Sequence, residues 1–211
     1  AMDFFNRYNC FDNIVIPKSY SKQCTDKIIT MDFFEGVHLD KWLKTGPTQK
    51  EKNTFAQSIW DFFAYFIMNH SIFHADPNIG NYLLLKNGKI GIIDFGCVKK
   101  LTIFTPEKLK KIMSLYAKNE SQKTIQFYIE LGMLPDTKSS YDSAVKEAIE
   151  DYSQWIDRAF EKSCFDFGKN KDYMSNRTAV MSTLGDRLTG GTSDDVMFFR
   201  VFFGLFNIFH K

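Results

Sequence analysis

The sequence has no cysteine framework, no excess charge of one sign and no apolar leader at its start. Its cysteines at 10, 24, 97 and 164 are scattered without a C-x-x-C pair. That scatter argues against a zinc site or a disulfide scaffold and favours a reducing compartment. A net charge of +2, without a strongly basic stretch, argues against nucleic acid as a partner. The start of the sequence shows no secretory signal.

The composition that is present is that of a folded, Phe-rich protein. Hydrophobic residues make up 44% and charged residues 25% of the 211 residues, which is ordinary for a globular domain. An aromatic share of 16%, with 22 Phe, predicts cores packed by phenylalanine. The length is enough for one substantial core or two small lobes. Ala1-Met2 does not resemble a natural start, and we expect a piece of a longer protein.

The first part of the chain alternates short apolar runs with polar turns. The β-branched runs at 14–17 and 27–31 predict two strands of a hairpin or small sheet. Thr48 and Glu51 have the spacing of a capping box. Apolar residues follow at helical spacing, so we expect an amphipathic helix from there to about Asn69.

A hairpin is predicted next. Two short apolar runs, 82–85 and 90–93, flank the Asn-Gly dipeptide at 87–88, which favours a type I′ turn. Both strands are apolar enough to be covered on both faces. Such a hairpin would bring Asn81 and Asp94, at the far ends of its strands, side by side.

The remainder of the chain is predicted to be helical. Helical patterns cover 105–117, 121–131, 141–160 and, more weakly, 174–184. The last helix, 194 to about 209, has almost no polar face. We interpret it as a buried core helix or, alternatively, as a helix that faces a membrane or a partner. It is well short of the ~20 residues that span a bilayer.

The most informative stretch is 74–81, His-Ala-Asp-Pro-Asn-Ile-Gly-Asn, followed by Asp-Phe-Gly at 94–96. Its Asp76, Asn81 and Asp94 stand five and thirteen positions apart. This spacing suits phosphoryl transfer from Mg-ATP, in which one aspartate orients a hydroxyl or water while an asparagine and a second aspartate hold magnesium. Neither H-x-D nor D-F-G says much alone. Joined in this order around a hairpin, they point to one site.

The pattern is similar to the protein-kinase-like H-R-D-x-x-x-x-N followed by D-F-G, with Ala75 in place of the arginine. More specifically, 74–81 and 88–96 resemble the UbiB (AarF) family of atypical kinases. The segment 29–36, Ile-Thr-Met-Asp-Phe-Phe-Glu-Gly, resembles the hinge of that family, with Asp32 in the place of a glutamate. The resemblance is specific from about residue 28 to 101 and diffuse beyond.

The resemblance implies an α+β fold, mostly helical: a protein-kinase-like large (C-terminal) lobe with a remnant β-hairpin of the small lobe. Residues 1–31 would be the remnant strands and 32–36 the hinge. Residues 37–211 would form the helical large lobe, with the catalytic loop and the D-F-G hairpin.

Site residues can be carried over position by position. The resemblance implies that Asp76 is the catalytic aspartate and that Asn81 and Asp94 are magnesium ligands, hard oxygen donors of the kind that Mg²⁺ prefers. His74 would support the loop rather than accept a proton. The nucleotide base would meet four residues: the backbone of Asp32 and Phe33 at the hinge, and an apolar floor formed by Leu83 and Ile93.

Several parts of such a kinase do not appear in this sequence. They are the glycine- or alanine-rich loop over the phosphates, the strand lysine with its helix glutamate, and the K-x-G-Q signature of the UbiB family. A missing small lobe is therefore one expected partner. We expect weak MgADP binding and little or no turnover from this chain.

The implied function is an atypical kinase or ATPase that binds Mg²⁺ and ATP and supports quinone (ubiquinone) biosynthesis. Its substrate would be lipid-like or a small molecule, with peripheral membrane contact as an option. Such a protein would be cytoplasmic or membrane-peripheral in a bacterium, or mitochondrial in a eukaryote. Two alternatives remain open at this point. One is a small-molecule phosphotransferase of the aminoglycoside-kinase type, and the other is a non-catalytic scaffold that binds a partner or membrane through its Phe-rich helices.

Overall fold

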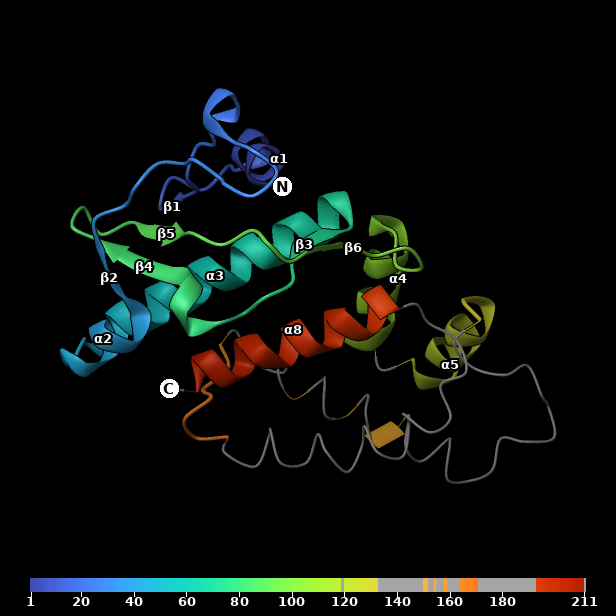
Figure 1. Cartoon of the computed structure of the whole chain (residues 1–211). Coiled ribbons are helices and arrows are strands. Elements are labelled where there is room, and N and C mark those ends of the chain that lie inside the picture. Colours follow the sequence, from blue (N-terminus) through green and yellow to red (C-terminus); the bar gives the residue numbers. More distant parts are fainter. Residues whose placement is uncertain are drawn as a thin grey trace. The chain divides into compact units, whose positions relative to one another are not determined.

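The computed structural model describes residues 1–118, 120–132, 150–151, 154, 158, 164–170 and 193–210. Its elements, in chain order (Figure 1), are α1 Met2–Tyr8, β1 Ile14–Val15, η1 Ser21–Gln23, β2 Gly36–His38, α2 Leu39–Lys44, α3 Gln49–His70, β3 Ile72–His74, η2 Ile79–Asn81, β4 Tyr82–Leu85, β5 Ile90–Ile92, β6 Val98–Lys100, α4 Pro106–Ala117, α5 Ser121–Glu130 and α8 Ser193–Phe209. The predicted helix at 174–184, and most of the one at 141–160, lie outside the described residues.

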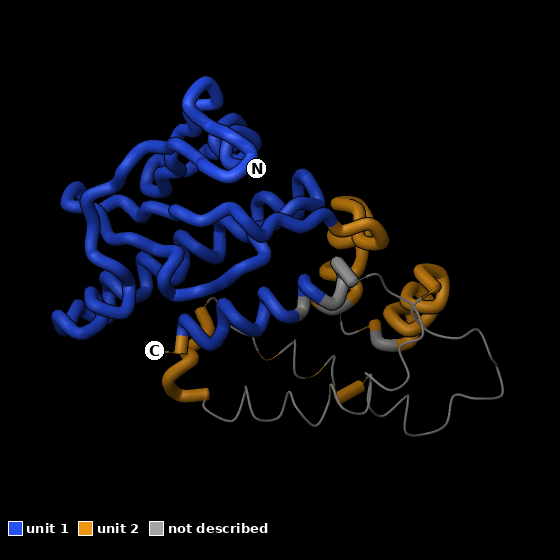
Figure 2. The backbone as a smooth tube through the Cα atoms, viewed as in Figure 1, with its two compact units in different colours: residues 1–100, 197–209, 211 blue, residues 101–196, 210 orange. Residues whose placement is uncertain are grey.

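The chain forms two compact units (Figure 2). Unit 1 comprises residues 1–100 and 197–209, so most of α8 joins the N-terminal half of the chain. Unit 2 comprises residues 101–196 and 210. Every candidate site residue named above lies in unit 1.

Unit 1 combines a small sheet with helices, which confirms the α+β class. Four strands pair in the order β1-β5-β4-β2. Within this sheet, β1 runs parallel to β5, while β4 is antiparallel to both β5 and β2. A second, two-stranded sheet pairs β3 with β6, placing His74 opposite Val98. The strands are short, whereas α3 alone has 22 residues.

Helix α3 begins and ends as its sequence dictates. The predicted capping box is present: the Thr48 side chain accepts from the backbone N–H of Glu51, whose own side chain accepts from the backbone of Thr48. The predicted apolar stripe is buried over its whole length (Phe55, Ile59, Phe62, Phe63, Phe66 and Ile67). The helix stops at Ser71, which adopts a left-handed φ of 53° and turns the chain directly into β3.

The hairpin β4–β5 is present as predicted, but its turn is of a different type. A type I′ turn needs positive φ at both central residues. Here the Gly88 N–H donates to the Leu85 carbonyl, Asn87 keeps a negative φ, and Gly88 takes a φ of 77°. This is the three-residue loop in which a glycine after the turn absorbs the left-handed conformation.

The N-terminal segment differs most from expectation. Residues 14–15 form β1, but 27–31 do not form a strand: Met31 makes an isolated bridge to Ser19. The apolar residues of that run are exposed, so burial does not fix an extended register there. Helix α1 was not anticipated. Its Phe5 is fully buried against the rings of Phe66 and Phe95, at centroid distances of 4.5 and 5.1 Å.

In unit 2, α4 and α5 lie where the sequence predicted helices. The long side chain of Lys111 on α4 reaches two groups of α5. Its Nζ lies 3.5 Å from a Glu130 carboxylate oxygen and 4.1 Å from the centre of the Phe127 ring. Gly132 follows α5 with a φ of 71°, as expected of a glycine that ends a helix.

Helix α8 is a core helix, which confirms the first of its two interpretations. Its side chains at 201, 203, 205, 206 and 208 are buried. Phe198 stacks on Phe63 of α3 at 6.1 Å, and Phe202 meets Trp60 at 5.6 Å. Among the helices that the structure describes, none is long and apolar enough to cross a membrane.

Candidate functional site

The loop between β3 and β4 carries two of the candidate residues, Asp76 and Asn81, which are hydrogen-bonded to each other. The Asn81 Nδ2 donates to the Asp76 carboxylate oxygen Oδ2 at 2.8 Å and to the Asp76 carbonyl at 3.1 Å. Asn81 is buried, and its backbone N–H donates to the carbonyl of Asn78 at 3.0 Å. Because the NH₂ of Asn81 is turned to Asp76, its amide oxygen is left as the group that can face a cation.

The β4–β5 hairpin brings the D-F-G segment next to Asn81. The N–H of Ile93, one residue before Asp94, donates to the carbonyl of Asn81 at 3.1 Å. Asp94 is exposed, and its Oδ1 accepts from the N–H of Gly96 at 2.8 Å. The expected side-by-side placement of the segments at 81 and 94 is therefore realised through the backbone.

His74, directly before the loop, contacts the D-F-G segment through both a ring nitrogen and the ring itself. Its Nε2 donates to the backbone carbonyl of Asp94, and its ring meets the edge of Phe95 at 5.2 Å. Burial lowers the pKa of His74, against smaller opposing contributions from that hydrogen bond and from the carboxylates of Asp76 and Asp94. A neutral, buried His74 that donates to a carbonyl is a structural support.

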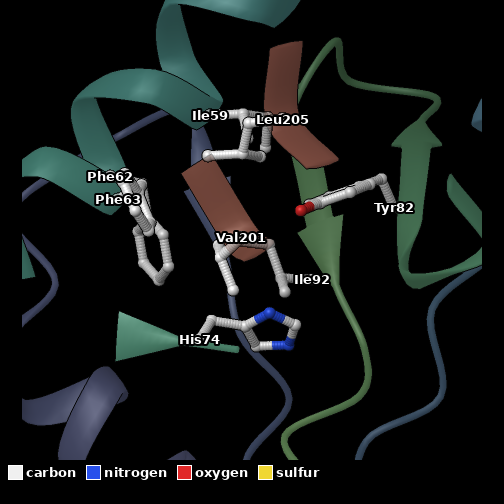
Figure 3. Close-up of a pocket in the computed structure, with 8 residues that line it drawn as sticks. All are labelled: Ile59, Phe62, Phe63, His74, Tyr82, Ile92, Val201 and Leu205. Atoms are coloured by element: carbon white, nitrogen blue, oxygen red, sulfur yellow. The ribbon is translucent and has the colours of Figure 1, made fainter. Parts of the chain in front are cut away.

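A small apolar pocket is lined in part by His74 and Tyr82, the residues on either side of this loop (Figure 3). Its lining comes from α3, β3, β4, β5 and α8, namely Ile59, Phe62, Phe63, His74, Tyr82, Ile92, Val201 and Leu205. The polar members are His74 and Tyr82, whose hydroxyl points inward. Burial first, and then the negative charge of Asp76, raises the pKa of Tyr82, so this phenol stays protonated. None of the three candidate residues lines the pocket. We therefore treat it as part of the core that supports the loop, not as the candidate site itself.

The two predicted magnesium ligands, Asn81 and Asp94, form only a partial ligand set. Within the part of the chain that the structure describes, no three His, Cys, Asp or Glu side chains converge on a metal position. Asp94 supplies one carboxylate and Asn81 one amide oxygen. Mg²⁺ is commonly held by one or two carboxylates plus waters and substrate phosphates, so this donor set suits a magnesium ion that arrives with a nucleotide.

On the hinge side, the structure holds Asp32 in a local network. The Tyr20 hydroxyl donates to Asp32 Oδ1 at 2.6 Å and the Lys18 N–H to Oδ2 at 2.9 Å. These two hydrogen bonds, the one from Tyr20 first, lower the pKa of Asp32. The backbone N–H of Asp32 donates to the Lys18 carbonyl at 3.1 Å, so this donor is already used. Phe33, the other predicted hinge residue, is 88% exposed.

The predicted apolar floor lies on the hairpin, with one ring that sequence reasoning missed. Leu83 is buried and Ile93 is half-buried. Gly91 pairs with Leu83, and a Cβ placed on Gly91 would lie 2.9 Å from the ring of Phe34. Phe34 therefore lies against β5, the strand that ends one residue before Ile93. The signal in the sequence was the glycine inside an apolar strand, which often marks a close approach.

Comparison with known proteins identifies the family. The model of the ABC1 atypical kinase-like domain matches residues 1–128. The chain therefore belongs to the ABC1 atypical kinase-like family, which agrees with the UbiB (AarF) resemblance of its motifs. The matched range includes both the 74–81 loop and the D-F-G segment.

Three curated relatives illustrate the similarity. The chain is 25% identical over 199 residues to "Atypical kinase COQ8, mitochondrial" of Saccharomyces cerevisiae, covering 90% of this chain and 38% of that protein. It is 34% identical over 90 residues to "Probable serine/threonine-protein kinase abkB" of Dictyostelium discoideum, covering 41% and 14%. It is 21% identical over 136 residues to "Protein ACTIVITY OF BC1 COMPLEX KINASE 8, chloroplastic" of Arabidopsis thaliana, covering 64% and 18%. The chain thus spans well under half the length of these relatives.

A solved structure shares the fold. A chain in the complex of Rv3197 with erythromycin from Mycobacterium tuberculosis matches with a TM-score of 0.70 and 16% identity. The match covers 98% of this chain and 50% of that one. At this level of identity the likeness extends to the fold alone.

Proposed function

We propose that this chain is the large-lobe part of an ABC1-type atypical kinase or ATPase and that it binds a magnesium nucleotide at the 74–96 site. One observation carries the proposal: Asn81 is bonded through its side chain to Asp76 and through its backbone carbonyl to the N–H of Ile93, the residue before Asp94. These two hydrogen bonds need no ligand, and they support the proposal because they join the loop of Asp76 and Asn81 to the segment that precedes Asp94.

The roles follow from the donor types. Asp94 and the amide oxygen of Asn81 would hold Mg²⁺, which when bound neutralises phosphate charge. Asp76 would orient the hydroxyl or water that attacks. Leu83 and Ile93 would contact the base from the hairpin, and the hinge segment at Asp32 and Phe33 would contact it from the other side.

The domain boundaries belong to the same proposal. Residues 1–31 would be a remnant of the small lobe, residues 32–36 would be the hinge, and residues 37–211 would be the large lobe. The phosphate-binding lysine has no counterpart in this sequence, so we expect MgADP binding that is weak and turnover that is low.

The test is a calorimetric titration of the purified chain with MgADP, comparing wild type with Asp94→Asn. Loss of a magnesium ligand should raise the Kd by about tenfold or more, equal to about 1.4 kcal/mol, and the difference should disappear in a magnesium chelator. The chain provides a matched control, since Asp166-Phe167-Gly168 repeats the D-F-G tripeptide in unit 2 on an exposed turn. There the Lys169 N–H donates to Asp166 Oδ1 at 3.1 Å.

Asp166→Asn should therefore leave the Kd unchanged. Equal affinities of wild type and Asp94→Asn would refute the magnesium assignment. A wild-type chain that binds no MgADP would favour the non-catalytic scaffold instead.

The cellular role that we propose is support of quinone biosynthesis, with a lipid-like or small-molecule substrate, in an organelle. It rests on the family resemblance and on relatives whose names place them in mitochondria or chloroplasts. Deletion of the full-length gene should lower the quinone content of the cell. An unchanged quinone content would contradict the role, and recovery of the full-length protein in the cytosolic fraction would contradict the location.

A further inference from the structure

Gly204 of helix α8 lies against Pro77 of the candidate catalytic loop. A Cβ built on Gly204 would lie 2.4 Å from Cγ of Pro77, 3.3 Å from its Cβ and 3.8 Å from its Cδ. Carbon atoms of real side chains do not approach to 2.4 Å. The ring of Pro77 is closed onto its own backbone and cannot rotate away as a flexible side chain would. An alanine at 204 therefore requires the loop or the helix to move.

Pro77 has little freedom to move without its neighbours. It follows Asp76 directly, and the Asn78 N–H donates back across it to the Asp76 carbonyl at 2.8 Å. On the far side of the loop, Asn81 is bonded both to Asn78 and to Asp76. A displacement of Pro77 therefore carries Asp76 with it and strains the Asp76–Asn81 pair.

The backbone conformation does not account for the glycine. Gly204 lies inside α8 and does not have a positive φ. Alanine is the better helix former at an ordinary interior position. The side chains on either side of it, Phe203 and Leu205, are both buried, which anchors this turn of the helix in the core of unit 1. The close approach of Pro77 is the local feature that requires a residue without a Cβ.

We propose that Gly204 is a positioning residue, and that α8 sets the position of the 76–81 loop through the Gly204–Pro77 contact. The consequence for nucleotide binding rests on the proposed function. The contact itself does not, because it can be measured without any ligand.

The experiment is a double-mutant cycle on the full chain, with Gly204→Ala, Pro77→Ala and the two combined. Replacing Pro77 by alanine removes Cγ and Cδ and leaves Cβ as the nearest atom, at 3.3 Å. The added methyl of Gly204→Ala then requires a shift of only a few tenths of an ångström. The matched control is Asn207→Ala, an exposed position one turn further along the same helix.

The primary measurement is amide hydrogen exchange without ligand, at Gly80, Asn81 and Ile93. Gly204→Ala should speed exchange at these amides by about tenfold or more, which corresponds to about 1.4 kcal/mol of loop-opening free energy. The double variant should return to within about threefold of Pro77→Ala alone. Asn207→Ala should match wild type.

Unchanged exchange in Gly204→Ala would overturn the proposal. So would exchange that stays fast in the double variant, because a general helix defect is not relieved at Pro77. If Gly204→Ala fails to fold, the double variant must fold, and its failure to do so would equally overturn the proposal.

Titration with MgADP separates this inference from the proposed function. Gly204→Ala should raise the Kd by about tenfold and the double variant should recover most of the loss. Absence of binding in wild type would reject the nucleotide function, while the exchange data would still decide the role of Gly204.

Discussion

The two sides of the candidate nucleotide site are built differently. The metal side comprises Asp76, Asn81 and Asp94. There, Asp76 and Asn81 are hydrogen-bonded to each other, and the strands on either side of their loop contain buried side chains. On the base side, the apolar side chains of Ile28, Ile29 and Phe33 are 59%, 68% and 88% exposed. The metal side is therefore held in place by contacts within the chain. On the base side Leu83 is buried, but the side chain of Phe33 in the hinge and those of Ile28 and Ile29 before it present apolar surface to solvent. Mutations should act on the stability of the first and on ligand contacts of the second.

The largest effect on the free energy of unfolding should come from removing a buried ring beside the metal side. Phe73 is fully buried directly before His74, and its ring lies 6.2 Å from those of Phe63 and Phe198. Phe73→Ala should lower the free energy of unfolding by about 3–5 kcal/mol, measured by urea denaturation. On the base side, Phe33→Ala should change it by no more than about 0.5 kcal/mol. Similar losses in both variants would abolish the distinction between the two sides.

A smaller effect on the free energy of unfolding should follow from removing the hydrogen bonds between Asn81 and Asp76. Asn81→Ala removes both side-chain hydrogen bonds to Asp76 and should cost about 1–3 kcal/mol of unfolding free energy. As a control, Asn69→Ala removes an exposed bond from Nδ2 to the Tyr65 carbonyl, of 2.8 Å, and should cost at most about 0.5 kcal/mol. Stability of Asn81→Ala equal to that of the control would show that the pair contributes nothing to the fold.

The smallest effect is a pH dependence confined to the metal side. Burial depresses the pKa of His74 in the folded state, so below about pH 6.5, the ordinary value, the unfolded chain binds a proton that the folded chain does not. Stability should therefore fall as the pH is lowered through that window, by at most about 1.4 kcal/mol per pH unit. In His74→Gln, which does not titrate, this part of the slope should be absent. Parallel stability curves for the two proteins between about pH 7.5 and 5.5 would contradict this.

Much of the metal side was predictable because its signals are local. The Thr48–Glu51 capping box starts α3, and the glycine at 88 closes the β4–β5 hairpin. The order of Asp76, Asn81 and Asp94 around that hairpin then indicates a site, because backbone pairing alone brings their segments together. Prediction of the I′ turn failed for an equally local reason, since a three-residue loop needs positive φ at Gly88 only.

The base side was predicted less well because local propensity does not decide it. The β-branched run at 27–31 has the composition of a strand, yet it makes one bridge and leaves its apolar side chains exposed. Strand propensity measures how a residue fits a half-buried pleated surface, and this run has no such surface in unit 1. The ring of Phe34 was missed because a glycine inside a strand marks a close approach without indicating which side chain makes it.

The sequence by itself determined the family, the order of the phosphoryl-transfer residues and the helix and hairpin that carry them. These features depend on hydrogen bonds and periodicities within a few residues. Only the tertiary structure decided what supports them: Phe5 of an unpredicted helix against Phe95, His74 under the D-F-G turn, and Gly204 against Pro77. Those contacts join segments far apart in the chain. Whether two such surfaces meet is decided by packing of the whole core, which no local pattern encodes.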